Sequence, residues 1–142
     1  MASQTIFPLA VVLDTNIVLD LFVFADPATR PVRSALEGGA LRWLATPAMR
    51  DELERVLAYP KIVPRLAFHQ LSATDVLAIF DRHSEQVEAS AKAPVTCKDP
   101  DDQKFIDLAV AYQATLLSKD RAVLALTKRL LPLSVHASAT LP

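Results

Sequence analysis

The chain alternates between short runs that are apolar throughout and longer stretches in which apolar residues recur every three or four positions. The run at residues 8–13 (PLAVVL) contains no polar side chain, which is typical of a central parallel strand covered by helices on both faces. Further strands are predicted at residues 42–45, 86–89, 114–118 and 133–136. The apolar pattern therefore predicts five short strands.

Helices are predicted between these strands, at residues 16–24, 28–37, 47–58, 72–85, 101–112 and 121–130. Strands that alternate with helices indicate an α/β fold with a parallel sheet and right-handed crossovers. In such sheets the ligand site lies at the carboxyl ends of the strands, near the point where the strand order reverses. Pro60 and Pro64 bound a stretch predicted as a short connector, and residues 1–142 are predicted to form a single domain.

Four carboxylates interrupt this pattern where a folded chain disfavours negative charge. Asp14 and Asp120 directly follow apolar strands, whereas Glu52 and Asp102 share the inward stripes of two predicted helices. Burial of an isolated ionised carboxylate is costly, so such groups pair with cations, accept several hydrogen bonds or take up a proton. Coordination of a metal ion would satisfy several of them together.

Each of these acids also has a purely structural interpretation. Asp14 and Asp120 stand at strand-to-helix turns, where an aspartate commonly caps the following helix. Glu52 could instead be a boundary residue that extends to solvent or pairs with Arg55 or Arg50. Taken singly, the acids leave both interpretations open, and four of them in this arrangement favour a site.

The segment CKDPDDQKFIDLA is more specific. Asp99 followed by Pro100 predicts a helix start with Asp99 as its N-cap. Acids in the first helical turn are favoured by the helix dipole, but Asp102 also shares the stripe of the apolar residues three, four and seven positions later. Asp101 and Asp107 are predicted to face solvent.

The order of four motifs, LDTN, DELERVL, KDPDDQKFIDLA and LLSKD, resembles the PIN-domain nucleases, in particular the branch of toxins from toxin–antitoxin pairs. The resemblance spans residues 11–132. It implies a three-layer α/β/α sandwich with a five-stranded parallel sheet in the order 3-2-1-4-5. It also implies an antitoxin protein as a partner.

The same resemblance implies roles for individual side chains. The residues that match the acidic metal-binding and catalytic quartet are Asp14, Glu52, Asp102 and Asp120, with Asn16 and Ser118 in supporting positions. The chain departs from the pattern at Lys98, where arginine is usual, and at Gln103, where a second acid is frequent. Neither departure touches the quartet.

Carboxylates are the ligands of hard cations, so the expected cofactor is Mg²⁺ or Mn²⁺, as one or two ions. The predicted function is a metal-dependent endoribonuclease that cleaves RNA phosphodiester bonds. A non-catalytic PIN-like module that binds RNA or protein is the alternative. An intact quartet counts against this alternative, because a degenerate site should have lost an acid.

The formal net charge of −1 gives no general attraction to nucleic acid, so RNA would have to be held by local cations or through metal ions. The basic residues nearest the acids in the sequence are Lys98, Lys104, Lys119 and Arg121. They are the candidates for phosphate contacts.

The remaining sequence features bear on the cellular location of the protein, its possible partners and the kinds of site it lacks. Cys97 is the only cysteine, which excludes an internal disulfide, favours a small buried thiol over a nucleophile and fits the cytoplasm. Asp14 and Asp20 interrupt the apolar stretch 6–25, so neither a signal peptide nor a membrane span is expected. Residues 17–24 are more apolar than one buried helix face requires, which suggests either contact with a second copy or an antitoxin helix, or a helix that is simply well buried in a small domain. The three histidines show no zinc-ligand spacing, and no phosphate-binding glycine loop is present.

Overall fold

Five parallel strands form the centre of the protein in a computed structural model, which describes residues 8–142. The strands are β1 (Leu9–Leu13), β2 (Leu41–Ala45), β3 (Ser84–Gln86), β4 (Thr115–Leu117) and β5 (Ala137–Ser138). They pair in the order β3-β2-β1-β4-β5. The predicted α/β class and the strand order 3-2-1-4-5 are both confirmed.

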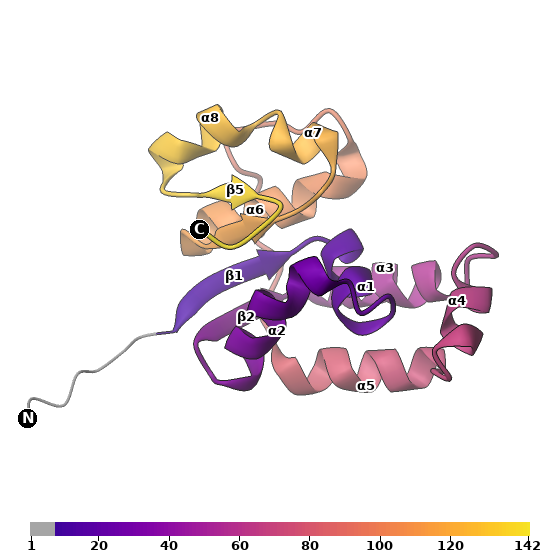
Figure 1. Ribbon diagram of the computed structural model, residues 1–142. Helices are drawn as coiled ribbons and strands as arrows, with labels where there is room; N and C mark the ends of the chain where they lie inside the picture. Colours follow the sequence, from indigo (N-terminus) through magenta and orange to yellow (C-terminus); the bar gives the residue numbers. More distant parts are fainter. Residues whose placement is uncertain (1–7) are drawn as a thin grey trace, which may run out of the picture.

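Helices cover both faces of this sheet (Figure 1). They are α1 (Thr15–Phe22), α2 (Arg30–Glu37), α3 (Pro47–Leu57), α4 (Val63–Phe68), α5 (Ala73–His83), α6 (Gln103–Tyr112), α7 (Arg121–Leu124) and α8 (Thr127–Leu130), with 3-10 turns η1 (Pro27–Thr29), η2 (Pro100–Asp102) and η3 (Leu131–Leu133). Right-handed crossovers place the helices that connect β1, β2 and β3 on one face and α6, α7 and α8 on the other.

The central strand explains the unbroken apolar run at its position in the sequence. Val11 pairs in register with Trp43 of β2 on one side and with Thr115 of β4 on the other. Val11 and Val12 are completely buried, since helices cover both faces of the strand. The strand delivers Asp14 to the carboxyl edge of the sheet, where the Asp14 N–H donates to the Leu117 carbonyl at 2.9 Å.

Two strands lie elsewhere than predicted. β3 occupies 84–86 instead of 86–89, because the Ser84 hydroxyl donates to the Phe80 carbonyl at 2.6 Å and α5 passes directly into the strand. β5 occupies 137–138 instead of 133–136, because Ser134 adopts a left-handed conformation with φ 63° after η3. Both are edge strands with partly exposed side chains, for which an apolar pattern is a weak guide.

Two helical assignments were also wrong. The connector between Pro60 and the next predicted helix contains α4, whose second residue is Pro64, a position that tolerates proline because its N–H needs no helical partner. The single helix predicted at 121–130 is divided into α7 and α8. The Thr127 hydroxyl donates to the Leu124 carbonyl at 2.7 Å and supplies a partner for the end of α7.

The apolar side chains of α1 are buried inside the domain. Ile17, Val18 and Leu21 are buried, and the Phe22 ring stacks on Trp43 with the ring centroids 6.0 Å apart. Phe24 is half-buried beneath the Arg65 guanidinium. The sheet and the neighbouring helices cover most of this segment, so its apolar character is explained within the domain and does not by itself require another chain.

Within residues 8–142, no helix is long and apolar enough to cross a membrane. The expectation that the chain begins without a signal peptide concerns residues 1–7 as well, which lie outside the described residues.

Candidate metal centre

The candidate site lies where β1 and β4 end side by side. Leu13 and Leu117 are in register, so Asp14 and Ser118 follow at the same edge of the sheet. The completely buried Ser118 hydroxyl donates to Asp14 Oδ2 at 2.6 Å and accepts from the Asp120 N–H at 3.0 Å. One hydroxyl thus connects two of the acids predicted for the site.

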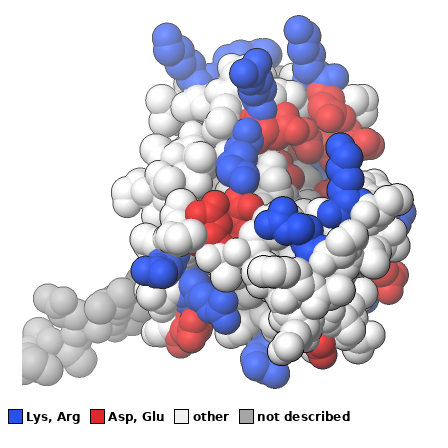
Figure 2. Space-filling view, turned by 45° about the vertical axis from the view of Figure 1, so that its right-hand side comes forward, with Lys and Arg blue, Asp and Glu red and all other residues white. Residues whose placement is uncertain are grey.

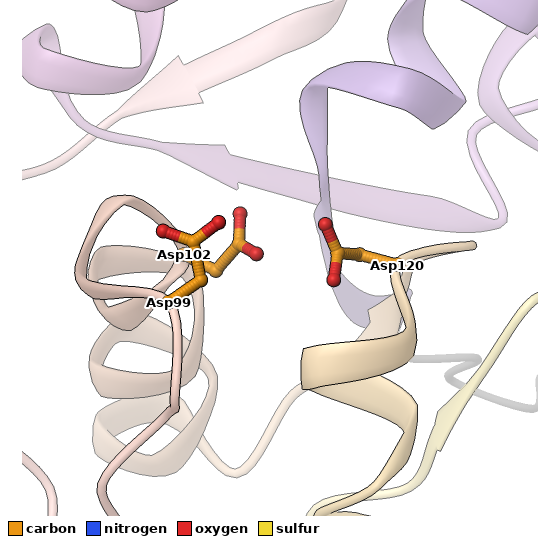
Figure 3. A group of neighbouring side chains, drawn as sticks. All are labelled: Asp99, Asp102 and Asp120. Atoms are coloured by element: carbon orange, nitrogen blue, oxygen red, sulfur yellow. The ribbon is translucent and has the colours of Figure 1, made fainter.

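Three carboxylates converge beside this pair. One oxygen from each of Asp99, Asp102 and Asp120 lies within 4.8 Å of the others, and Figure 3 shows the carboxylates of Asp99 and Asp102 facing that of Asp120. Asp99 and Asp102 come from the turn before α6, and Asp120 precedes α7. Like charges brought this close favour a bound cation, because mutual repulsion is otherwise uncompensated.

Sequence reasoning assigned Asp99 to helix capping alone. The capping contact exists, since Asp99 Oδ1 accepts from the Asp101 N–H at 2.9 Å. The same side chain nevertheless belongs to the acidic cluster. The signal that could have found it is its spacing of three residues from Asp102 at a helix start, which places both side chains on one side of the turn.

The carboxylate of Asp102 is buried and incompletely hydrogen-bonded. Its side chain is only 7% exposed, and Oδ2 is buried without a hydrogen-bond partner among the described residues. Burial, followed by the charges of Asp14 and Asp120, raises the pKa of Asp102 to about 7. A buried carboxylate oxygen that lacks a donor and faces other acids fits the requirements of a divalent-cation ligand.

The environment of Asp14 also disfavours the ionised form of its side chain. Burial raises the pKa of Asp14, the Ser118 hydrogen bond opposes this effect, and the charges of Glu52 and Asp120 add to it. Asp14 occupies the N-cap position of α1, but its side chain accepts no capping hydrogen bond. The capping interpretation is therefore wrong for Asp14, whereas Asp120 does cap α7, by accepting from the Ala122 N–H at 2.8 Å.

Glu52 stands apart from the cluster of three acids. Its carboxylate accepts a short hydrogen bond from the Thr15 hydroxyl and a hydrogen bond from Lys104 Nζ at 2.6 Å. Of the arginines considered as partners, Arg50 instead forms an ion pair with Asp81 at 2.8 Å. The negative charge of Glu52 is one of the causes that raise the pKa of Asp14. Lys104 forms an ion pair with Glu52 and so balances the Glu52 charge.

Two of the four basic candidates are paired with carboxylates in the described part of the chain. Asn16 Oδ1 accepts from the backbone N–H of Lys119 at 3.3 Å, and the Lys119 ammonium forms an ion pair with the buried Asp20. Lys119 and Lys104 are therefore engaged by carboxylates. Lys98 and Arg121 are exposed and form no ion pair within residues 8–142.

Lys and Arg side chains border an acidic hollow on the molecular surface (Figure 2). This juxtaposition suits a polyanion whose phosphate approaches a metal ion, since the cations can contact flanking phosphates without neutralising the cluster itself.

Gln103 fastens the loop that precedes the site. Its Oε1 accepts from the Cys97 N–H at 2.7 Å, while Nε2 donates to the Val95 carbonyl at 2.9 Å and to Asp107 at 2.8 Å. Asp107, predicted to face solvent, is half-buried and also accepts from the Ala93 N–H at 2.8 Å. The departure at Gln103 thus supplies a donor that an acid could not.

We expect Gln103→Glu to lower the free energy of unfolding by about 1–3 kcal/mol at pH 7, because a carboxylate would face the Val95 carbonyl and Asp107. The loss should shrink towards acid pH, where the new carboxyl can carry a proton and donate. Urea unfolding at pH 5 and pH 7 measures this difference. Equal stability of wild type and variant at pH 7 would show that the loop does not depend on the Gln103 amide.

The fold and the site together define a class: α/β proteins in which carboxylates gather at the carboxyl edge of a parallel sheet, in an arrangement that could hold a divalent cation. The model of the PIN domain family matches residues 10–122, most of the chain. The chain belongs to the PIN domain family, which comprises nucleases. No curated protein matches the sequence significantly.

A solved structure shares the fold. One chain in the crystal structure of VapBC2 from Rickettsia felis, bound to a DNA fragment from their promoter, aligns with a TM-score of 0.59 and 16% sequence identity. The alignment covers 91% of the present chain and 98% of that chain. The shared fold therefore extends over nearly the entire length of both chains.

Proposed function

We propose that the protein is a metal-dependent endoribonuclease. The observation that carries the proposal is the buried, unpartnered Oδ2 of Asp102 within a cluster of three carboxylates. A purely structural site would be expected to pair this atom, since a buried polar atom without a partner costs stability. Membership of a nuclease family supplies the class of reaction.

Asp99, Asp102 and Asp120 would hold the ion, with Asp14 beside them and Glu52 contributing directly or through water. The oxygen ligands suit Mg²⁺ or Mn²⁺. When bound, such an ion would supply a water of lowered pKa and neutralise charge on the phosphate. Activity with both ions but not in EDTA is the expected pattern.

The chain's own residues would keep this arrangement rigid. The Ser118 hydroxyl orients Asp14 through Oδ2, and the N–H groups of Asp120 and Ala122 hold the turn that carries Asp120. Lys104 balances Glu52, so that a fifth negative charge does not add its full repulsion to the site. Orientation of ligands by such neighbouring contacts commonly decides metal affinity.

The test is an endonuclease assay on a single-stranded RNA labelled at one end. We expect internal cleavage with Mg²⁺ or Mn²⁺, its loss in EDTA and its return when either ion is added in excess. RNA binding without cleavage under every metal condition would instead support the non-catalytic module. Contamination by a host ribonuclease is controlled with an active-site variant purified in parallel.

We infer that the protein also has a protein partner, of the antitoxin type. The structurally similar chain comes from the two-protein VapBC2 assembly. Around α4, the apolar side chains of Tyr59, Val63 and Phe68 are 52%, 49% and 80% exposed. Exposed apolar residues on and beside one short helix are candidates for contact with a partner helix. The proposed setting is the cytoplasm, where the buried free thiol of Cys97 needs no disulfide.

We expect Phe68→Ser to remove most of the association with this partner while the melting temperature stays within a few degrees, because the ring is exposed and supports little of the core. The wild type and the Phe68→Ser variant are each purified together with any bound partner. Sedimentation of the two preparations at micromolar concentration provides the measurement. A homodimer that persists without any partner would instead assign the surface to a second copy. A monomer with no co-purifying protein would contradict the inferred interface.

A further inference from the structure

A cavity of about 330 Å³ opens beside the acidic cluster, between the loop before η2 and the helices α7 and α8. Its lining consists of Thr96, Lys98, Ala122, Ala125, Leu126 and Arg129. Two of its lining residues are neighbours of acids in the cluster. Lys98 immediately precedes Asp99, and Ala122 donates its backbone N–H to Asp120 at 2.8 Å. The lining of the cavity therefore adjoins residues of the acidic cluster.

The lining combines two kinds of surface. Ala122, Ala125 and Leu126 form an apolar part, whereas Lys98 and Arg129 contribute two exposed cations. Within the described part of the chain neither cation has a carboxylate partner. Unpaired cations beside an apolar surface match a nucleotide, which presents an anionic phosphate at one end and a flat, largely apolar base face at the other.

A second small cavity near the site lacks this combination. Thr46, Ala48, Ala89, Ser90, Lys104 and Asp107 line it. Its only cation, Lys104, is held by Glu52, and Asp107 brings a negative charge. Charge complementarity to a phosphate therefore favours the cavity at Lys98 and Arg129.

We propose that this cavity binds one nucleotide of the single-stranded RNA, adjacent to the phosphate that is cleaved. Lys98 and Arg129 contact the phosphate of that nucleotide, and its base packs against Ala122, Ala125 and Leu126. The inference rests on the proposed function for the identity of the strand. It adds Arg129 to the residues that determine RNA binding. Arg129 is not one of the basic residues nearest the predicted site acids in the sequence.

The test measures binding separately from cleavage. A fluorescein-labelled single-stranded RNA is titrated with protein in EDTA, and anisotropy gives the dissociation constant over a range of KCl concentrations. We expect Arg129→Gln and Lys98→Gln each to weaken binding about tenfold at low salt, as for loss of one charge-assisted hydrogen bond. The slope of log K against log salt should become shallower by about 0.7 for each lost phosphate contact. Lys128→Gln, which removes an exposed neighbouring charge outside the cavity, should have little effect.

A second variant tests the apolar part without changing charge. Ala125 is exposed and has an ordinary helical conformation, so Ala125→Leu should fold normally while filling the cavity. We expect weaker RNA binding with an unchanged salt slope, because the phosphate contacts remain. Melting temperatures of all variants, measured in the same buffer, verify that they are folded.

Two results would overturn the inference. One is Arg129→Gln behaving like Lys128→Gln in both affinity and salt slope, and the other is wild type failing to bind the RNA at low salt. These outcomes are distinguishable from failure of the proposed function. Metal-dependent cleavage can persist while the cavity variants bind normally, and the cavity variants can lose binding in a protein that never cleaves.

Discussion

Asp14→Asn is expected to lower the rate of Mg²⁺- or Mn²⁺-dependent RNA cleavage by at least about 10², since removal of a carboxylate from the site weakens stabilisation of the transition state by several kcal/mol. The substitution keeps the shape of the side chain, and an amide oxygen can still accept from the Ser118 hydroxyl. Initial rates on a single-stranded RNA, with metal in excess, provide the measurement.

The protein should remain folded in this variant. Burial raises the pKa of Asp14, so the protein environment penalises the charged form and a neutral amide relieves that cost. Asp101→Asn is the matched control, because Asp101 lies in the same acidic turn as Asp102 but is exposed. Comparable losses from Asp14→Asn and Asp101→Asn, or undiminished cleavage by Asp14→Asn, would show that the inward-facing acids are structural.

Mn²⁺ is expected to stabilise the wild-type protein strongly at pH 7.5. A ligand at a hundred times its dissociation constant adds about 2.7 kcal/mol of stability, which corresponds to an increase of about 10 °C in melting temperature for a domain of this size. Asp102→Asn should lose most of this response, because Oδ2 of Asp102 is the unpartnered oxygen in the cluster. An identical response of wild type and variant to Mn²⁺ would exclude Asp102 as a metal ligand.

The same pair of proteins should differ in the absence of metal. Because the pKa of Asp102 is raised from 3.8 to about 7, its contribution to stability is fully present below the unfolded value and is lost as the pH rises through the folded value. The metal-free wild type should therefore lose stability between about pH 4 and pH 7 relative to Asp102→Asn. Thermal unfolding in EDTA across this range tests the sign, and a difference that stays constant with pH would contradict it.

The sequence by itself determined the centre of the fold and brought attention to the sheet edge where the candidate acids lie. The apolar run before Asp14 predicted a strand covered on both faces, and alternation with amphipathic helices predicted a parallel sheet. Asp14 and Ser118 follow adjacent strands, and such ends meet at one edge in a parallel sheet. The strand order came from the family resemblance carried by four short motifs. The individual strands and helices were predictable because each depends on residues close together in the chain.

The edge strands and α4 were less accessible to sequence reasoning. β3 and β5 have partly exposed side chains and gain order mainly by pairing with β2 and β4. Their position is therefore decided by where the preceding helix or turn ends. For example, the left-handed backbone of Ser134 delays β5 beyond the predicted residues. Local apolar periodicity contains little of this information.

Only the tertiary structure decided which charges are paired and which are free. Lys104 binds Glu52, 52 residues away, and Lys119 binds the buried Asp20, so two of the four predicted phosphate contacts are already engaged. Asp99 joins Asp102 and Asp120 although its local role as a cap explained it fully in the sequence. Periodicity assigns a side chain to a face of its own element. Partners across elements depend on how those elements pack, and therefore on contacts that no local pattern specifies.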